Sequence, residues 1–358
     1  MNSDVSKEQM EYFWKKKEFV SFILCILVFL IHISSFAHYS NSGAPIDEVN
    51  QKLTFFFKES ITRFAVPMYF ILSGIAFFRD YENKKYFSKL KSRFFTLCIP
   101  YLIWNTLCML FDIICSYTFI SNYLTGRKLF VISVENIFKG IFLHENNIPF
   151  WYILFLICFA ILTPLLNKLI CSKKIGIASL IVLSCIHTLH IGGNHSDAIV
   201  YYLLGAWIGK HYMAFSVRRA SKKEQLFSCI FLVLYVLGKN AFPTNDYYIK
   251  PFVTIVVFVL ASYSLWNIVD GFMDKIKMIP LYSRSFAIFA MHTNVSAIIC
   301  KILYLIFPRN GYFALPNLII TIIITTMSIN VFCIVFERLM PSTYALFMGK
   351  GIKKKQQK

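Results

Sequence analysis

The chain has 358 residues, of which 57% are hydrophobic and 15% are charged, and its mean hydropathy is +0.59. A soluble chain of this length normally carries about 25% charged residues, so the composition excludes an ordinary soluble protein. Repeated apolar runs of about twenty residues predict an all-α, polytopic integral membrane protein, whose net charge of +19 faces membrane surfaces rather than nucleic acid.

Ten apolar stretches are predicted to form helices that cross the membrane. They cover residues 19–37, 61–78, 94–118, 150–166, 175–190, 197–210, 225–239, 250–269, 285–306 and 314–336. Cytoplasmic segments retain positive charge, and with the N-terminus inside, 27 lysines and arginines fall in inside segments against nine outside. We therefore predict about ten transmembrane helices with the N- and C-termini cytoplasmic. Omitting only the sixth or only the seventh helix would move a basic cluster outside.

One transmembrane unit is predicted. Residues 1–18 form a cytoplasmic N-terminal segment, 19–340 the transmembrane domain and 341–358 a basic cytoplasmic tail. The largest outer loop, 119–149, contains VISVENIFKGIF, whose apolar spacing suits a helix lying at the membrane interface. There is no internal repeat and no matched pair of broken helices such as many transporters show. This disfavours a transporter without excluding one.

Cysteines and most histidines show no pattern of a site. Nine of the ten cysteines lie in apolar runs and no pair has metal-binding C-x-x-C spacing, so we expect small packing residues rather than disulfides. The eight histidines are scattered, with no H-x-x-x-H on a clear helical face. The sequence therefore predicts no metal site.

The first span, within FILCILVFLIHISSFAHYS, contains a titratable imidazole at His32. His32 lies about thirteen residues into its helix, roughly 20 Å from the inner surface, and so in the outer half of the bilayer. A second intramembrane histidine, His292 in SRSFAIFAMHTNV, lies nearer the middle. Packing with a backbone partner is one explanation for each, but two such histidines on separate helices favour a shared polar site.

The second span, RFAVPMYFILSGIAFF, combines Pro67, which lacks a backbone donor, with Gly74, which permits close helix approach. We expect a bent, tightly packed helix in which Ser73 either faces a cavity or is one of the small residues that let helices pack closely.

A basic stretch, RDYENKKYFSKLKSRFF, follows the second span. The positive-inside rule and anionic lipid headgroups explain it. Alternatively, Lys91 and Arg93 hold a phosphorylated ligand at a cytoplasmic mouth.

Seven motifs occur in a fixed order along the chain. They are ILVFLIH, RFAVPMYFILSG, RFFTLCIPYLIW, NIPFWYILFLICFAILTPLL, YYLLGAWIG, FAIFAMH and VFERLMP. Each is mostly apolar and therefore weak by itself. Taken together, over residues from about 15 to 342, the series resembles the acyltransferase 3 family of membrane acyltransferases.

This resemblance implies an enzyme that moves an acyl group, commonly acetyl, from cytoplasmic acyl-CoA to a hydroxyl of a glycan or similar acceptor. The family's first-helix histidine matches His32, and its late histidine matches His292. Its R-x-x-R pair matches at Arg93 but has Thr96 at the second position. The family usually carries an arginine eleven residues before the first histidine, where this chain has Ser21.

The resemblance also implies a set of donor contacts. Arg63 and Ser73 match the family's second-helix pattern. The predicted donor-binding residues are therefore Arg93, Lys91, Arg63 and Ser73. The two departures remove fixed cations that would hold a phosphate or carboxylate of acyl-CoA. Lys17, one helical turn before Ser21, and Lys91 are candidates to replace these cations. The alternatives are that the protein handles the acyl donor differently or has lost its activity.

The predicted mechanism uses acyl-CoA as co-substrate, with no tightly bound cofactor. His32 acts as general base on the acceptor hydroxyl, or as a transient acyl carrier, and His292 orients it or the acceptor. A neutral imidazole with a pKa of about 6.5 suits a base at neutral pH. The expected partners are a glycan or polysaccharide acceptor and membrane lipids, in the inner (plasma) membrane of a bacterium; the sequence does not indicate the oligomeric state. The alternative is a transporter or flippase-like carrier of a glycan or lipid intermediate.

Overall fold

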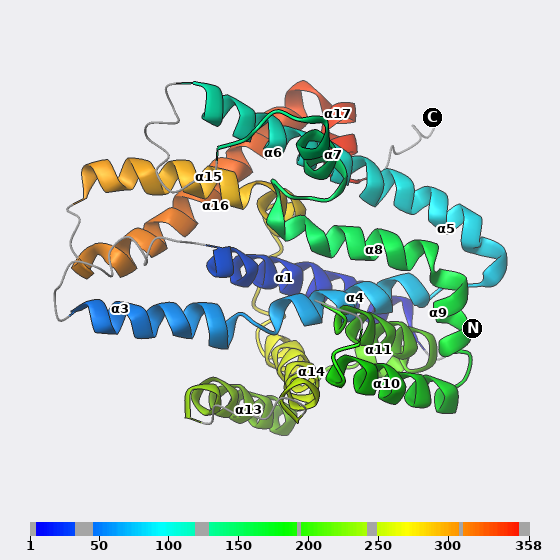
Figure 1. The fold of residues 1–358 in the computed structure, drawn as a ribbon. Helices are drawn as coiled ribbons and strands as arrows, with labels where there is room; N and C mark the ends of the chain where they lie inside the picture. The colour runs from blue at the N-terminus through cyan, green and yellow to red at the C-terminus, as the bar shows by residue number, and fades with distance from the viewer. Residues whose placement is uncertain are drawn as a thin grey trace.

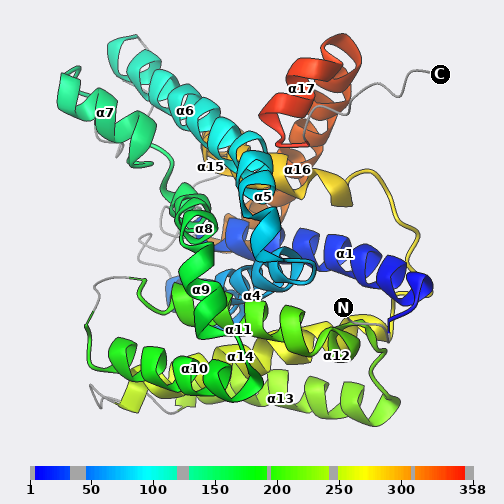
Figure 2. The same ribbon diagram turned by 90° about the vertical axis from the view of Figure 1, so that its right-hand side faces the viewer.

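The computed structural model describes residues 5–32, 46–118, 129–191, 195–241, 249–307 and 311–350. All regular structure in these ranges is helical, which confirms the all-α prediction. Helix α1 (Lys7–His32) lies in the middle of the bundle, packed against α4 (Ala65–Phe78) and α15 (Ser285–Ile306) (Figures 1 and 2). The first predicted span is therefore a neighbour of both the second and the ninth.

Helix α1 begins twelve residues before the predicted start of the first span. The hydroxyl of Ser6 accepts the Gln9 N–H at 3.1 Å, and the Gln9 amide oxygen accepts the Ser6 N–H at 2.9 Å. This reciprocal capping box satisfies two of the backbone donors that a helix start leaves open. Phe13 and Lys16 then bury the early turns in the bundle. The predicted end of this span, residues 33–37, lies outside the described residues.

Two π-helical turns occur in the next part of the chain. The elements are α3 (Ile46–Phe55), η1 (Phe56–Ile61), α4 (Ala65–Phe78), η2 (Asn83–Lys85), α5 (Tyr86–Arg93), η3 (Phe94–Cys98) and α6 (Ile99–Tyr117). Pro67 lies in the first turn of α4, where a missing N–H costs no intrahelical hydrogen bond. Pro100 is the second residue of α6 and follows the π-turn η3 directly, inside one continuous helical segment. The second and third predicted helices are thus parts of longer helical segments.

The fourth predicted helix, 150–166, is broken. The elements here are α7 (Val134–Phe142), η5 (Ile148–Phe150), α8 (Trp151–Ile161) and α9 (Thr163–Leu169). The segments on either side of the break meet at 76°. Pro164, in the first turn of α9, cannot donate back to α8 and so ends the straight helix. Helix α7 confirms that the predicted outer-loop segment is helical.

The remaining elements follow the predicted order. They are α10 (Lys173–Thr188), α11 (Ala198–His211), α12 (Met213–Val217), α13 (Lys222–Ala241), α14 (Ile249–Asp270), η6 (Tyr282–Arg284), α15, η7 (Gly311–Phe313), α16 (Ala314–Leu339) and α17 (Pro341–Phe347). Each of the ten predicted stretches contains a helix.

Not all of these helices are long and apolar enough to cross a membrane by themselves. Five segments of the described chain are: Ile46–Phe78, Asn83–Tyr117, Pro251–Asp270, Tyr282–Ile306 and Gly311–Leu339. A sixth is added if the bent pair α8 and α9 forms one span. The structure therefore shows a helical bundle with five or six candidate spans. Ten spans and cytoplasmic termini stay a prediction.

Helices α4 and α11 touch at the backbone, as the sequence predicts for Gly74. A Cβ atom on Gly74 would lie 2.3 Å from the carbonyl oxygen of Tyr202, and one on Gly205 would lie 2.0 Å from that of Ile71. No side chain fits at either position, so glycine lets the helices approach closely. This contact holds α4, and with it Ser73, rigidly in the bundle.

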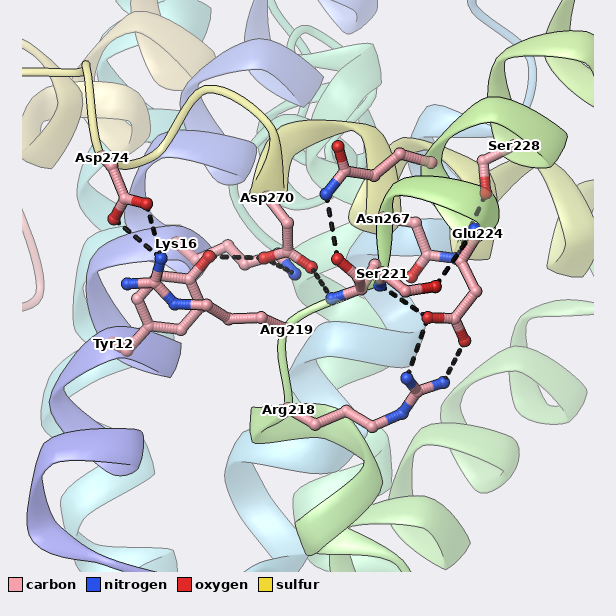
Figure 3. A network of polar contacts seen from close by, with 12 residues as sticks. Tyr12, Lys16, Arg218, Arg219, Ser221, Glu224, Ser228, Asn267, Asp270 and Asp274 are labelled. Carbon is pink, nitrogen blue, oxygen red and sulfur yellow. Dashed lines mark hydrogen bonds and ion pairs between the residues drawn. The ribbon is translucent and has the colours of Figure 1, made fainter.

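A buried ion pair joins the start of α1 to the end of α14 (Figure 3). The Lys16 ammonium lies 2.7 Å from the Asp270 carboxylate, with both side chains at most 2% exposed. Asp270 also accepts from the Tyr12 hydroxyl at 2.5 Å and from the Ala220 N–H at 2.8 Å. Lys16 lies 4.0 Å from the centre of the Trp266 ring. Burial lowers the pKa of Lys16 to about 8 and Asp270 opposes this shift, so the ammonium stays charged at neutral pH.

Candidate active site

The two predicted catalytic histidines lie side by side. His32 is the last residue of α1, and His292 lies about two turns into α15. Their ring centroids are 5.5 Å apart, and the ring of Phe29, one turn before His32, lies 5.2 Å from that of His292. Packing of α1 on α15 thus brings together residues that are distant in sequence.

The hydrogen bonds of His292 determine its tautomer. Its Nδ1 lies 2.9 Å from the carbonyl oxygen of Phe289 and 3.2 Å from that of Ile288. Because a carbonyl oxygen only accepts, Nδ1 carries the proton and Nε2 of the neutral ring presents a lone pair. This Nε2 is buried and has no hydrogen-bond partner among the described residues. A backbone partner therefore accounts for one nitrogen of the ring, and the other is available for a ligand or a neighbouring donor.

A chain of hydroxyl groups connects α8, α4 and α1. The Ser73 hydroxyl lies 2.7 Å from that of Tyr152, which lies 3.3 Å from the carbonyl oxygen of Tyr69. The Tyr69 hydroxyl donates at 2.5 Å to the carbonyl oxygen of Ser21. Since the one hydrogen of Tyr152 goes to a carbonyl, Ser73 donates to Tyr152. The predicted Ser73 is thus linked to Ser21, the position where the resemblance expects an arginine.

One aromatic ring lies between the hydroxyl chain and the histidine pair. The ring of Phe289 is 6.1 Å from that of Tyr152 and 6.3 Å from that of His292. The ring of Phe150, which is fully buried, stacks on the ring of Phe289, with 5.7 Å between the ring centroids. The two polar features are therefore neighbours inside an apolar, aromatic environment, where polar interactions are strengthened by the low dielectric.

Two cations lie near the hydroxyl chain without a carboxylate partner. Arg93 ends α5 half-buried, its guanidinium 5.2 Å from the centre of the Phe77 ring, and its charge acts on the Tyr152 hydroxyl. Lys17, one turn before Ser21, is also half-buried. Burial, and after it the like charge of Arg93, lowers the pKa of Lys17. Across the described ranges neither cation has an acidic group within 4.0 Å.

The other two predicted donor contacts lie elsewhere. Lys91 is exposed on α5. The Arg63 guanidinium binds the carboxylate of Glu59, with Nε 2.8 Å from Oε2. Arg63 precedes α4, and Phe77, against which Arg93 packs, is the next-to-last residue of that helix, so the two are separated by about 21 Å along the helix axis. The fold therefore brings Arg93 and Ser73 into one region and leaves Lys91 and Arg63 outside it.

Some residues of this region are not predicted from the sequence. Tyr69 and Tyr152 look like ordinary aromatic residues of apolar spans, and their hydroxyl groups are the one local signal of a polar role. Asn147, which precedes η5, is 1% exposed, and both polar atoms of its amide lack a partner in the described structure. Because η5 packs on α15, this amide lies on the same side of the bundle as the helix of His292. No group of three potential metal-binding side chains occurs in the described ranges.

These features define a polytopic helical membrane protein with a polar site enclosed by its helices. Residues 19–337 match the acyltransferase 3 family model, which describes an acyltransferase domain. The chain therefore belongs to this family, as the seven motifs predict, and the family identifies it as a membrane acyltransferase. Neither a curated protein nor a solved structure matches the chain.

Proposed function

We propose that the protein is a membrane O-acyltransferase that transfers an acetyl group from cytoplasmic acetyl-CoA to a hydroxyl of a cell-surface or lipid-linked glycan. The bacterial plasma membrane is the proposed location. The observation that carries the proposal is the pair of adjacent histidines, His32 on α1 and His292 on α15, in a chain of this family. Ionisable side chains within a membrane are costly and mark functional sites.

The proposed reaction begins with His32 as general base. An imidazole nitrogen of His32 takes the proton of the acceptor hydroxyl while its oxygen attacks the thioester carbonyl carbon. The tetrahedral intermediate then expels the CoA sulfur, which receives that proton from His32, and the acceptor is left as an ester. General-base catalysis of this kind typically contributes roughly 10²- to 10⁴-fold.

His292 is assigned a positioning role. Its Nε2 can accept a hydrogen bond, because Nδ1 holds the ring proton against two backbone carbonyls. An N–H of His32 directed at this atom would leave the other nitrogen of His32 unprotonated and directed at the acceptor. A hydrogen bond to one ring nitrogen decides which nitrogen of a histidine carries the proton, and this is the role assigned to His292.

The donor end of the site is proposed at Arg93 and Lys17. Two half-buried cations with no acidic partner among the described residues suit the phosphates of CoA, which would offset the cost of burying both charges. Ser73 and Tyr152 line the route from these cations towards Phe289 and the histidines. Lys91 is a peripheral contact in this proposal, and Arg63 lies at the far end of α4.

The first prediction concerns the histidines. We expect His32→Ala to reduce ester-linked acetyl on surface polysaccharide by roughly 10²-fold or more, and His292→Ala to reduce it less. His187→Ala is the matched control, since His187 is a histidine at a helix end that bonds Ser196 at 2.7 Å. Ester-linked acetyl is measured per unit of protein in the membrane. Normal acetylation in His32→Ala cells at normal protein level would contradict the proposal.

Release of free CoA separates acyl transfer from transport. Purified protein given acetyl-CoA and a candidate glycan should release CoA in proportion to the ester formed. A flippase-like carrier would instead move the glycan across vesicle membranes without consuming acetyl-CoA. Glycan movement without CoA release would therefore assign the chain to the second class.

A further inference from the structure

An apolar hollow of about 280 Å³ lies between α4, α11, α12 and α14. Ile71 and Ile75 of α4, Ile208 of α11 and Leu260 of α14 form part of its wall. Two residues along a helix correspond to a rotation of about 200°, so Ile71 and Ile75 lie on the face of α4 opposite to Ser73. The hollow is therefore separate from the hydroxyl chain and from the histidine pair.

The lining of the hollow suits hydrocarbon rather than water. Two of its polar side chains are already engaged: the Ser262 hydroxyl donates to the Phe258 carbonyl oxygen at 2.7 Å, and the Asn267 amide donates to Ser228 at 3.2 Å. A buried water needs two or more polar partners, whereas an apolar cavity of about 150 Å³ stays dry and binds a small hydrocarbon. The larger hollow described here has room for a length of lipid chain.

A basic segment, residues 218–224, meets one end of the hollow, and Figure 3 shows the polar contacts that hold this segment. Arg218 and Ala220, from the connection between α12 and α13, line that end. Arg218 binds Glu224 through two contacts of 2.5 and 3.0 Å. Lys222 and Lys223, the first residues of α13, are exposed and form no ion pair with the described residues. Residues 218–224 thus carry four basic side chains and one acidic one.

The basic segment is held in place from two sides. The Ser221 N–H donates to the Glu224 carboxylate at 2.7 Å, and the Ser221 hydroxyl accepts the Glu224 N–H at 3.3 Å. Asp270, itself paired with Lys16, accepts the Ala220 N–H. These bonds fix the backbone from Ala220 to Glu224, which carries Lys222 and Lys223 and begins at the hollow, so that binding need order only the two lysine side chains.

We infer that the hollow binds one chain of an anionic phospholipid, whose phosphate is held by Lys222 and Lys223. The positive-inside rule explains basic residues at this membrane surface, but it does not explain an apolar hollow that Arg218 and Ala220 of the same segment line. An apolar hollow next to a fixed cationic segment is complementary to a molecule with a hydrocarbon tail and an anionic head. The site is independent of the acyl-transfer reaction proposed above.

The tail contact is tested by filling the hollow. Leu260→Trp places an indole at the hollow, and Val256→Trp, one turn earlier on α14, is the matched control; the two side chains are 42% and 41% exposed, and only Leu260 is among those that line the hollow. For the delipidated wild-type protein in detergent, phosphatidylglycerol should raise the unfolding midpoint by about 5 °C. Val256→Trp should keep this rise and Leu260→Trp should lose it. Equal rises in both variants would overturn the assignment.

The head contact is tested by charge removal. Lys222→Gln/Lys223→Gln should weaken phosphatidylglycerol binding by about 30-fold, measured by native mass spectrometry. Lys173→Gln/Lys174→Gln, at the start of α10, is the control with the same charge change and should leave binding unchanged. Phosphatidylcholine with the same chains should bind the wild-type protein as weakly as phosphatidylglycerol binds the double variant. Equal binding of both lipids, or equal loss in both double variants, would contradict the inferred headgroup site.

Discussion

Ser21 stands where the motif resemblance leads us to expect an arginine, and the structure shows what surrounds this position. The carbonyl oxygen of Ser21 accepts from Tyr69, and the neighbouring cation is Lys17, one helical turn earlier on α1. Lys17 is near enough to Arg93 for the two charges to act on each other. A lysine on a flexible stem can place its ammonium a turn away from its backbone position, so we propose that Lys17 supplies the missing charge.

The second prediction follows for the donor contacts. Arg93→Ala and Lys17→Met should each raise the KM for acetyl-CoA by about 10- to 100-fold, because a lost charge-assisted hydrogen bond costs about 1.5–3 kcal/mol. Lys91→Ala should raise it much less, since Lys91 is exposed. Selectivity among acceptor glycans should not change in any of the three. A rise for Lys91→Ala as large as that for Lys17→Met would show that the donor binds on the outer surface of α5.

The third prediction concerns the buried pair of Lys16 and Asp270. Lys16→Met leaves a buried carboxylate without its counter-charge, and we expect a loss of stability of about 3–5 kcal/mol. In Lys16→Met/Asp270→Asn the charge is removed, while an amide oxygen can still accept the Ala220 N–H, so most of the stability should return. Thermal unfolding in detergent followed by circular dichroism measures both. If the double variant were less stable than Lys16→Met, the pair would contribute mainly through its polar atoms rather than its charges.

At the scale of elements, helix α13 begins at a capping box that titrates. The Arg218 guanidinium, and after it the bonds from Ser221, lower the pKa of Glu224 to about 2. Because the folded pKa lies below the usual value of 4.5, the stabilisation is fully present above pH 4.5 and is lost as the pH falls towards 2. Acid should therefore loosen the first turn of α13.

The fourth prediction is that amide hydrogen exchange detects this loosening of the first turn of α13. Protection of the first-turn amides of α13 should fall between about pH 4.5 and pH 2 in the wild-type protein. Glu224→Gln, which cannot ionise, should show no such fall after correction for the intrinsic exchange rate. Identical profiles for the two proteins would show that the carboxylate does not hold the helix start. The capping pattern S-x-x-E is visible in the sequence as SKKE, but its partner Arg218 is identified by the fold.

Helix boundaries show where the sequence pattern is insufficient. Apolar runs predict each of the ten helical stretches, but not the early start of α1, because Lys7 to Lys17 form a polar segment whose burial depends on α14 and the 218–224 connection. The break between α8 and α9 follows from Pro164 and is visible locally. The π-turns η1 and η3 are not, since their cause is a change of helix register that hydropathy does not report.

At the scale of the whole molecule, the number of spans is the open prediction. By length and apolarity five or six segments of the described chain can cross a membrane, whereas the distribution of positive charge predicts ten spans. Helices α10, α11 and α13 account for part of the difference. Each of them is apolar on average but shorter or more polar than an isolated span, so the ten-span arrangement requires neighbouring helices to hold them in the membrane.

The fifth prediction tests this topology with reporter fusions on either side of α14. A fusion after residue 245 should be extracytoplasmic and one after residue 276 should be cytoplasmic, because ten spans place α14 as an inward-running helix. Alkaline phosphatase is active only on the extracytoplasmic side, whereas green fluorescent protein fluoresces on the cytoplasmic side, so the two reporters give opposite signals at each fusion site. A cytoplasmic reporter after residue 245 would exclude the ten-span arrangement.

The amino-acid sequence by itself determines the class of this protein: apolar runs and sparse charge specify a helical membrane protein, and ordered motifs specify its family. Both are local or additive properties that need no knowledge of contacts. The pairing of His32 with His292, the link from Ser73 to Ser21 and the ion pair of Lys16 with Asp270 are decided by tertiary structure alone. These contacts join distant segments, and they depend on helix approach and rotation, which glycine contacts and π-turns set and hydropathy cannot encode.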